Sequence, residues 1–210
     1  MTADTTVEIE PGHLRGTQKN GIHSFKGIPY AQSTAGPGRF MRPRKPQQWT
    51  GIRDAMALGD QAPQLDRAIR PANAWIRDTT QSGENCLTLN VYTPAVNDGG
   101  RRPVMVWLHG GGYTAGSGGA NGLDGSNLAR RGDVIVVTLN HRLNAFGYCY
   151  LAGAGGEKFA DSGNAGMLDI VMALEWVRDN IGEFGGDDGN VTIFGQSGGG
   201  SKVAVMMTMP

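Results

Sequence analysis

The sequence has few cysteines and no surplus of charge. Its 210 residues include two cysteines, Cys86 and Cys149, and 19 basic residues balance 19 acidic ones. Two cysteines cannot build the disulfide framework of a small secreted domain, and neither their spacing nor nearby histidines indicate a metal site. A net charge of zero provides no electrostatic attraction to nucleic acid or to an anionic membrane. We therefore expect no metal site and no nucleic-acid partner.

Long apolar runs are also missing. The longest, VMVWL and VIVV, are far shorter than the roughly 20 apolar residues that a membrane-spanning helix needs. Residues 1–16, MTADTTVEIEPGHLRG, have no apolar stretch that resembles a signal peptide. These absences predict a protein without membrane association in the cytoplasm, where both thiols stay reduced.

Glycine, in contrast, is abundant. The chain has 34 glycines, roughly twice the usual share. They cluster at the ends of apolar runs, where the backbone needs conformations that other residues avoid. No repeat and no linker divides the chain, so we expect residues 1–210 to belong to a single domain.

The first half of the chain is predicted to be mainly strand and loop. Residues 6–31 alternate polar and apolar side chains around two turn signals, which predicts a small antiparallel sheet. Residues 32–83 lack periodicity. Residues 87–94 alternate as a half-buried strand does, and residues 103–109 form a continuous β-branched run that is typical of a strand buried on both faces.

The second half alternates strands and helices. Residues 133–140 predict another buried strand, and apolar residues at helical spacing predict an amphipathic helix over residues 165–184. Residues 190–194, NVTIF, again predict a buried strand, and residues 198–207 predict a helix. This alternation indicates an α/β fold with a mostly parallel central sheet.

Ser197 lies in a G-x-S-x-G pattern between Gly195 and Gly199. A predicted strand precedes it and a predicted helix follows, which is the setting of a nucleophilic serine on a sharp turn. Side chains two residues before and after such a serine would collide, and the two glycines remove that collision. The alternative is a glycine-rich helix N-terminus without chemistry.

A second glycine cluster, HGGGYTAGSGG at residues 109–119, directly follows a predicted strand. Consecutive glycines can turn backbone N–H groups into a cleft, where they stabilise the oxyanion of an acyl-transfer intermediate. Gly110, Gly112 and Ala115 also fit the dinucleotide fingerprint G-x-G-x-x-A. However, more glycine follows in place of a helix, and the next strand ends in Asn140 where an acidic residue would hold a ribose. We favour the oxyanion interpretation and expect no cofactor.

Six segments in this order and spacing resemble type-B carboxylesterases, the branch of the α/β-hydrolase fold that includes the cholinesterases. The resemblance extends from about residue 7 to the last residue. It implies an α/β-hydrolase fold and a carboxylic ester hydrolase that works through an acyl-serine intermediate on a small-molecule ester. The segments are FKGIPYA (25–31), ENCLTLNVYTP (84–94), PVMVWLHGGGY (103–113), LNHRLNAFGY (139–148), GNAGMLD (163–169) and VTIFGQSGGGSKV (191–203).

The resemblance also assigns roles to individual residues. It implies Ser197 as the nucleophile and the amides of Gly111, Gly112 and Gly198 as the oxyanion hole. It further implies two structural ion pairs that fasten loops beneath the site, Arg39 with Glu84 and Arg142 with Asp169.

Two departures from the family pattern bear on chemistry. The residue before the nucleophile is often glutamate in the family and is Gln196 here, which favours neutral over cationic substrates. The family cysteine at Cys86 commonly closes a disulfide loop, but its usual partner position holds Ala62. We therefore expect Cys86 and Cys149 to be free thiols.

The third departure is the missing triad histidine. In this fold the order along the chain is serine, acid, histidine. The thirteen residues after Ser197 contain no Asp, Glu or His. His109, beside the glycine loop, is the most plausible base among the four histidines that precede the serine, which are His13, His23, His109 and His141.

We interpret residues 1–210 as the N-terminal portion of a single carboxylesterase domain whose remaining part supplies the acid and the histidine. Two alternatives stay open. One is a non-catalytic, cholinesterase-like binding module, and the other is an inactive esterase fragment.

Overall fold

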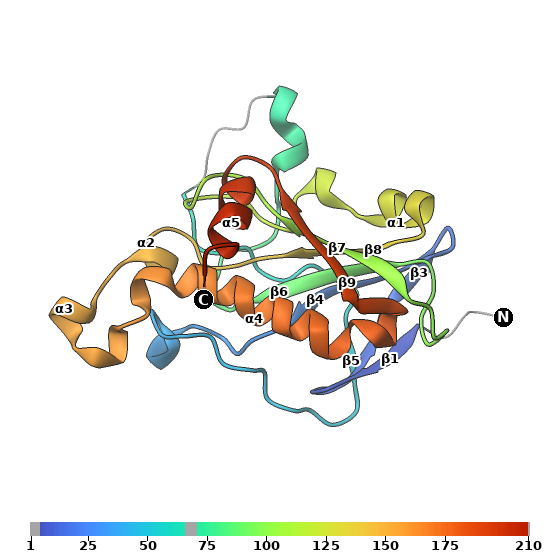
Figure 1. Cartoon of the computed structure of the whole chain (residues 1–210), viewed down its shortest axis with the longest axis horizontal. Helices are drawn as coiled ribbons and strands as arrows, with labels where there is room; N and C mark the ends of the chain where they lie inside the picture. The colour runs from blue at the N-terminus through green and yellow to red at the C-terminus, as the bar shows by residue number, and fades with distance from the viewer. Residues whose placement is uncertain (1–4, 66–70, 210) are drawn as a thin grey trace.

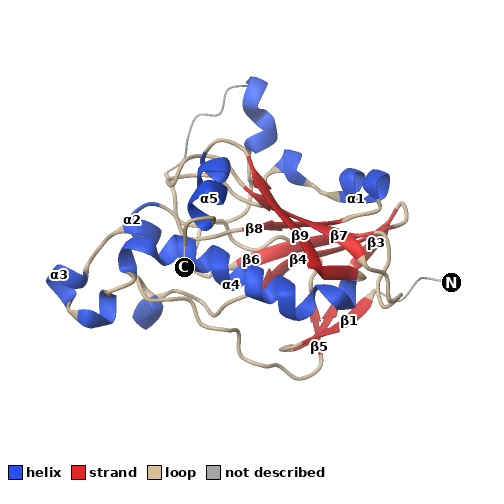
Figure 2. Cartoon of the chain, viewed as in Figure 1, coloured by secondary structure: helices blue, strands red, loops and turns tan. Residues whose placement is uncertain are grey.

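The computed structural model describes residues 5–65 and 71–209. A twisted six-stranded sheet forms the centre of the molecule, with helices on both faces (Figures 1 and 2). Its strand order is β3–β4–β6–β8–β7–β9. The strands are β3 (Thr17–Lys19), β4 (Ile22–Pro29), β6 (Thr88–Thr93), β7 (Arg102–Leu108), β8 (Ile135–Leu139) and β9 (Gly186–Gly195).

The prediction of a mostly parallel sheet is wrong for this part of the fold. β7 pairs in parallel with β8 and β9, whereas β3/β4, β4/β6 and β6/β8 are antiparallel pairs. A two-residue turn at Asn20 and Gly21, with φ of 52° and 76°, joins β3 to β4, and such turns connect only antiparallel neighbours. The parallel pairs occur where a longer connection with a helix separates the strands.

The small sheet at the N-terminus also differs from expectation. It contains β1 (Thr6–Ile9), β2 (Gly12–Arg15) and β5 (Ile52–Asp54), with β1/β2 antiparallel and β2/β5 parallel. The rest of the segment predicted as one antiparallel sheet extends the large sheet as β3 and β4. Phe25 and Ile28 of β4 are fully buried in the main core, which explains why this strand pairs with β6.

The two faces of the central sheet are covered by different helices. Every residue of β8 is buried. Ile135 and Val137 belong to the main core, whereas Val136 between them packs with Ala129 of α1 (Ser126–Gly132). Successive strand residues point to opposite faces, so α1 covers the face opposite the main core.

The predicted helix over 165–184 is present. α4 (Ala165–Asn180) runs across the sheet and continues as a 3₁₀ turn (Ile181–Phe184) (Figure 1). Gly185, with a left-handed φ of 77°, ends it. The buried side chains of α4 include Ile170, Ala173 and Val177.

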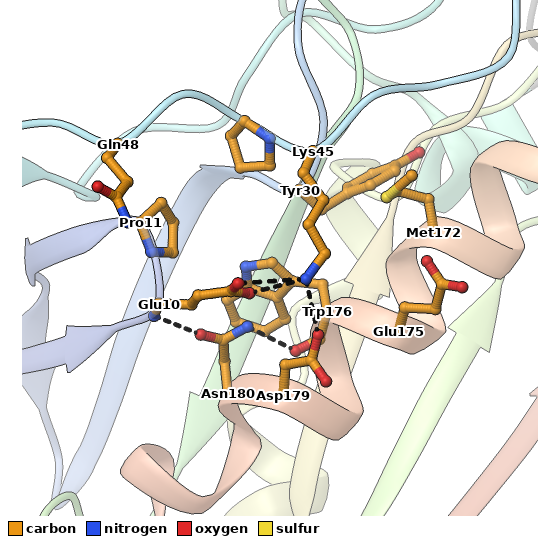
Figure 3. A pocket seen from close by; sticks show the side chains of 11 residues that line it. Glu10, Pro11, Tyr30, Lys45, Gln48, Met172, Glu175, Trp176, Asp179 and Asn180 are labelled. Atoms are coloured by element: carbon orange, nitrogen blue, oxygen red, sulfur yellow. Dashed lines mark hydrogen bonds and ion pairs between the residues drawn. The ribbon is translucent and has the colours of Figure 1, made fainter.

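Polar contacts tie the small sheet to the end of α4 (Figure 3). The Glu10 amide donates to Asn180 Oδ1 over 2.8 Å. Lys45 Nζ lies 3.0 Å from Glu10 Oε2 and 3.2 Å from Asp179 Oδ2. A hollow of about 160 Å³ lies beside these groups. The contacts fix the position of the small sheet, which lies on a different part of the fold from the glycine loop.

β9 is not the buried strand that NVTIF predicts. Residues 190–192 are exposed, and Val191 retains 36% of its accessible surface. β9 lies at the edge of the sheet and pairs only with β7 among the described strands. Its apolar residues therefore stay partly exposed, because no described strand pairs with its outer edge.

Shorter elements complete the described fold. Helix α5 (Gly198–Met206) follows β9 directly. No helix in residues 5–65 and 71–209 is long and apolar enough to cross a membrane. The remaining elements are α2 (Asn144–Tyr148), α3 (Ala152–Gly155) and 3₁₀ turns at Gly36–Gly38, Pro71–Ile76, Asn121–Leu123, Glu157–Phe159 and Ser162–Asn164.

Candidate active site

The pairing of β7 with β9 brings the two glycine-rich segments together. The strands run in parallel, and their last residues, Leu108 and Gly195, are partners in the ladder. The carboxyl ends of parallel strands lie at the same edge of a sheet, where ligands of open α/β folds bind. The loop after β7 therefore lies beside Ser197.

Ser197 occupies a strained turn between β9 and α5. Its φ of 55° and ψ of −122° are unusual for a residue with a side chain. A Cβ on Gly195 would lie 2.6 Å from the Leu108 carbonyl oxygen, and a Cβ on Gly199 would overlap that same oxygen. The turn leaves Ser197 exposed at the N-terminus of α5, where the helix dipole favours negative charge.

The glycine loop contacts the start of α5. A Cβ on Gly198 would lie 2.6 Å from the Gly112 amide nitrogen, so the two backbones touch. Gly111 and Gly112 have φ of 99° and 65°, which only glycine adopts readily. Among the described hydrogen bonds, none uses the amides of Gly111 or Gly112. Gly198 is the first residue of α5, so its amide has no partner within the helix.

Two amide side chains hold the loop in place. Gln64 accepts from the Gly116 amide over 2.8 Å and donates to the Gly116 carbonyl over 3.0 Å. Asn140 accepts from the Gly118 amide over 2.7 Å and from Ser117 Oγ over 3.0 Å. Asn140 thus fixes the position of the loop at Ser117 and Gly118. No helix begins within residues 109–119, so the loop lacks the geometry of a dinucleotide site.

The His109 ring is buried and has partners other than Ser197. Only 2% of its surface is exposed, and its Nδ1 lies 2.8 Å from the Gly110 carbonyl oxygen. Its ring stacks on His141 at a centroid distance of 4.8 Å. Burial lowers the pKa of His109 to about 4. No hydrogen bond in the described part of the chain joins it to Ser197.

The other histidines lie elsewhere. His141 is fully buried, with its Nδ1 2.9 Å from the Arg142 carbonyl oxygen. His23 contacts Gln18 within the β3–β4 hairpin, and His13 is exposed on β2. No histidine in residues 5–65 and 71–209 is hydrogen-bonded to Ser197.

The two ion pairs implied by the family resemblance have short contacts in the structure. Arg39 Nε and Nη2 donate to the two Glu84 carboxylate oxygens over 2.7 and 2.6 Å. Arg142 Nε and Nη2 donate to Asp169 over 2.8 and 2.5 Å, and both side chains are at most 1% exposed. Arg142 also donates to the Met41 carbonyl over 2.7 Å, which links α4 to the irregular segment before β5.

Cys86 and Cys149 are free thiols in the structure. Cys86 is fully buried, and burial, with a smaller contribution from Asp169, raises its pKa to about 12. Its thiol is therefore protonated and unreactive at neutral pH.

Ser197 opens onto a large cleft. The cavity has a volume of about 780 Å³, which is within the range of small-molecule sites. Its walls combine exposed apolar side chains of the 3₁₀ turn Pro71–Ile76 with polar groups of the loops. The lining residues include Gln64, Trp75, Ile76, Trp107, Gln196 and Ser197.

Sequence reasoning assigned no role to Lys202 of α5. Its side chain is completely buried, and Nζ donates to the carbonyl oxygens of Gly112 and Gly198 over 2.5 and 3.3 Å. The available signal was a single lysine directly before the apolar run VAVMM, little more than one helical turn after Ser197.

Comparison with known proteins identifies relatives across the whole chain. The model of the Carboxylesterase family matches residues 3–210. Para-nitrobenzyl esterase of Bacillus subtilis (strain 168) is 43% identical over 207 residues, which cover 97% of this chain and 40% of the relative.

Solved structures agree with the sequence comparison. An esterase from anaerobic Clostridium hathewayi, described as able to hydrolyze aliphatic aromatic polyesters, is 45% identical with a TM-score of 0.90. The match covers 98% of this chain and 40% of that one. A Geobacillus stearothermophilus carboxylesterase is 43% identical with a TM-score of 0.87 over 98% of this chain and 40% of that one. The chain thus spans about 40% of the length of these relatives. It belongs to the carboxylesterase family and has the α/β-hydrolase fold of its members.

Proposed function

We propose that this chain carries the nucleophile and oxyanion hole of a serine carboxylesterase. The observation that supports this most is the position of Ser197. It lies exposed on a positive-φ turn beside Gly111 and Gly112, whose amides take part in no described hydrogen bond, at the mouth of a cleft of about 780 Å³. A glycine-rich helix start without a function would not need this backbone strain.

The proposed chemistry is acyl transfer in two steps. Ser197 Oγ attacks the ester carbonyl carbon while a histidine accepts the hydroxyl proton. The carbonyl oxygen becomes an oxyanion that accepts hydrogen bonds from the amides of Gly111, Gly112 and Gly198. The C–O bond then breaks, the alcohol leaves with the proton, and water hydrolyses the acyl-serine by the same steps.

The acid and the histidine are proposed to lie outside residues 1–210, in a later part of the same domain. Two observations support this. His109 is buried and bonded to Gly110, and no other described histidine contacts Ser197. In addition, the outer edge of β9 is unpaired among the described strands, which leaves room for further strands of the sheet.

The proposed substrates are neutral carboxylic esters of small molecules. Gln196, beside the nucleophile, carries no charge, and Trp75 and Ile76 offer apolar surface to the cleft. The name of the Bacillus subtilis relative points in the same direction, because a para-nitrobenzyl ester is neutral and aromatic.

Covalent labelling tests the proposal. The complete product of the reading frame, with and without Ser197→Ala, is treated with a fluorophosphonate and assayed with para-nitrophenyl butyrate. We expect one phosphonylated serine, Ser197, and hydrolysis that disappears in Ser197→Ala. A folded wild-type protein that neither reacts nor hydrolyses esters would instead be a non-catalytic binding module.

A further inference from the structure

Lys202 is a buried cation without a described anionic partner. Its side chain is 0% exposed, yet none of the ion pairs in residues 5–65 and 71–209 includes it. Its Nζ donates to the Gly112 and Gly198 carbonyl oxygens and lies 4.6 Å from the centroid of the Tyr113 ring. A buried ammonium group held only by carbonyl oxygens and a ring face is costly to desolvate, so stability alone does not explain this residue.

The two carbonyls belong to two of the three residues whose amides form the proposed oxyanion hole. We propose that Lys202 is a positioning residue of this hole, which fastens the glycine loop to the start of α5 and places a positive charge beside the developing oxyanion. This inference rests on the proposed esterase function and adds to it a residue that controls the geometry of the hole.

Gly112 depends on Lys202 more than its neighbours in the loop do. The Gly111 carbonyl accepts from the Ala115 amide over 3.2 Å, and Gly116 is held by Gln64. Gly112 packs against the Gly198 backbone, but its only described hydrogen bond is the one from Lys202. Loss of that bond would remove the polar contact that fastens Gly112 to the start of α5.

The charge of Lys202 also acts at the site. The titratable groups that face it are His109 and His141, from the segments after β7 and β8, and Tyr113 of the loop. Burial lowers the pKa of both histidines, to about 4 for His109, so both are neutral at pH 7. Burial lowers the pKa of Lys202 to about 8. Lys202 is therefore the one cation of this group near neutrality, and it loses its charge as the pH rises above about 8.

The test replaces Lys202 in the complete product of the reading frame. Lys202→Met keeps the length of the side chain and removes the donor and the charge. We expect kcat for para-nitrophenyl butyrate to fall about 10- to 100-fold, less than the loss of a whole oxyanion donor, with KM within about twofold. The Ki of a trifluoromethyl ketone, whose adduct with the serine carries an oxyanion, should rise by the same factor as kcat/KM falls.

Two further variants separate positioning from general packing. Lys202→Gln, which keeps a donor without the charge, should recover part of kcat. Lys158→Met removes an exposed lysine that lies 4.8 Å from the Phe159 ring centroid and should leave all parameters unchanged. The wild type should lose activity above about pH 8, and Lys202→Met should lack this alkaline limb.

An NMR measurement tests the inference without catalysis. The amide resonances of Gly112 and Gly198 should differ in chemical shift between the wild type and Lys202→Met at the same pH, because the substitution removes the donor to both carbonyl oxygens. The inference is overturned if these resonances coincide in the two proteins, or if Lys202→Met keeps the wild-type kcat and Ki. A wild type without Ser197-dependent hydrolysis would overturn the proposed function, while the resonances would still decide the role of Lys202.

Discussion

At the scale of single residues, the candidate site depends on positions where no side chain fits. The turn at Ser197 requires glycine two residues before and two residues after it, because a Cβ at position 195 or 199 would lie within 2.6 Å of the Leu108 carbonyl oxygen. The same close approach places the carboxyl end of β7 against the start of α5. Backbone contact at this point, not side-chain chemistry, sets the position of the nucleophile.

The first prediction concerns Gly199. Gly199→Ala should lower the free energy of unfolding by about 1–3 kcal/mol, because the new methyl group overlaps the Leu108 carbonyl oxygen and the backbone must move. Phosphonylation of Ser197 should slow at least tenfold. Gly200→Ala is the matched control, since its Cβ would lie 3.5 Å from the Gly195 oxygen, an ordinary contact. Equal stability and labelling rates for the two variants would contradict the prediction.

The second prediction concerns substrate charge. Gln196→Glu adds a negative charge beside Ser197 and should raise kcat/KM for butyrylcholine relative to ethyl butyrate about two- to fivefold, since an exposed charge pair contributes up to about 1 kcal/mol. The two esters share an acyl group, so their ratio reports on the alcohol side alone. The gain should shrink at 0.5 M salt. An unchanged ratio would show that the charge of residue 196 does not reach the substrate.

At the scale of elements, the carboxyl ends of β7 and β8 meet in a stacked pair of buried imidazoles. The rings of His109 and His141 are 4.8 Å apart and nearly parallel, with an interplanar angle of 4°. Each Nδ1 lies within hydrogen-bonding distance of a backbone carbonyl oxygen. Protonation of either ring would place a charge in a buried environment next to Lys202.

The third prediction is a loss of stability in mild acid. The unfolded chain protonates His109 as the pH falls through about 6.5, whereas the folded protein keeps it neutral until about pH 4. The unfolded state therefore binds more protons in this window, and the free energy of unfolding decreases as the pH is lowered. His109 alone should lower the free energy of unfolding by about 2 kcal/mol when the pH is lowered from 7 to 5. Urea unfolding at both pH values measures the difference.

His109→Phe should reduce this acid sensitivity because phenylalanine can stack but cannot titrate. His13→Gln, at an exposed position on β2, is the control and should leave the difference between the two pH values unchanged. The same acid sensitivity in wild type and His109→Phe would mean that the buried ring is protonated in the folded state as readily as in the unfolded one.

The sequence alone predicts features that depend on residues close to one another in the chain. The Ser197 turn, the glycine loop and the helix over 165–184 all follow from local glycine placement or helical period. Features that depend on distant pairing were not predictable in this way. The apolar sequence of β9 suggested burial, but burial depends on a neighbouring strand that only the fold specifies. Lys202 was missed because two of its three partners, Gly112 and Tyr113, are distant in sequence.

At the scale of the whole molecule, the described chain has an open side. β9 lies at the edge of the sheet with one described partner, and exposed edge strands can pair with other chains. Apolar side chains of α5 and the residues after it are exposed on the same part of the fold, with Val205 at 39% and Met207 at 81%. Such exposed apolar groups often mark surfaces that contact other protein.

The last prediction compares residues 1–210 with the complete product of the reading frame. We expect the 210-residue chain to self-associate in light scattering and to lack steady ester turnover. Loss of the triad histidine reduces turnover by about a millionfold in a serine hydrolase, which leaves about 10³–10⁴ over water. The longer product should be active, and Ser197→Ala should abolish its activity. Steady turnover by residues 1–210 that Ser197→Ala abolishes would place a base inside these residues, and His109→Gln would then be the first variant to test.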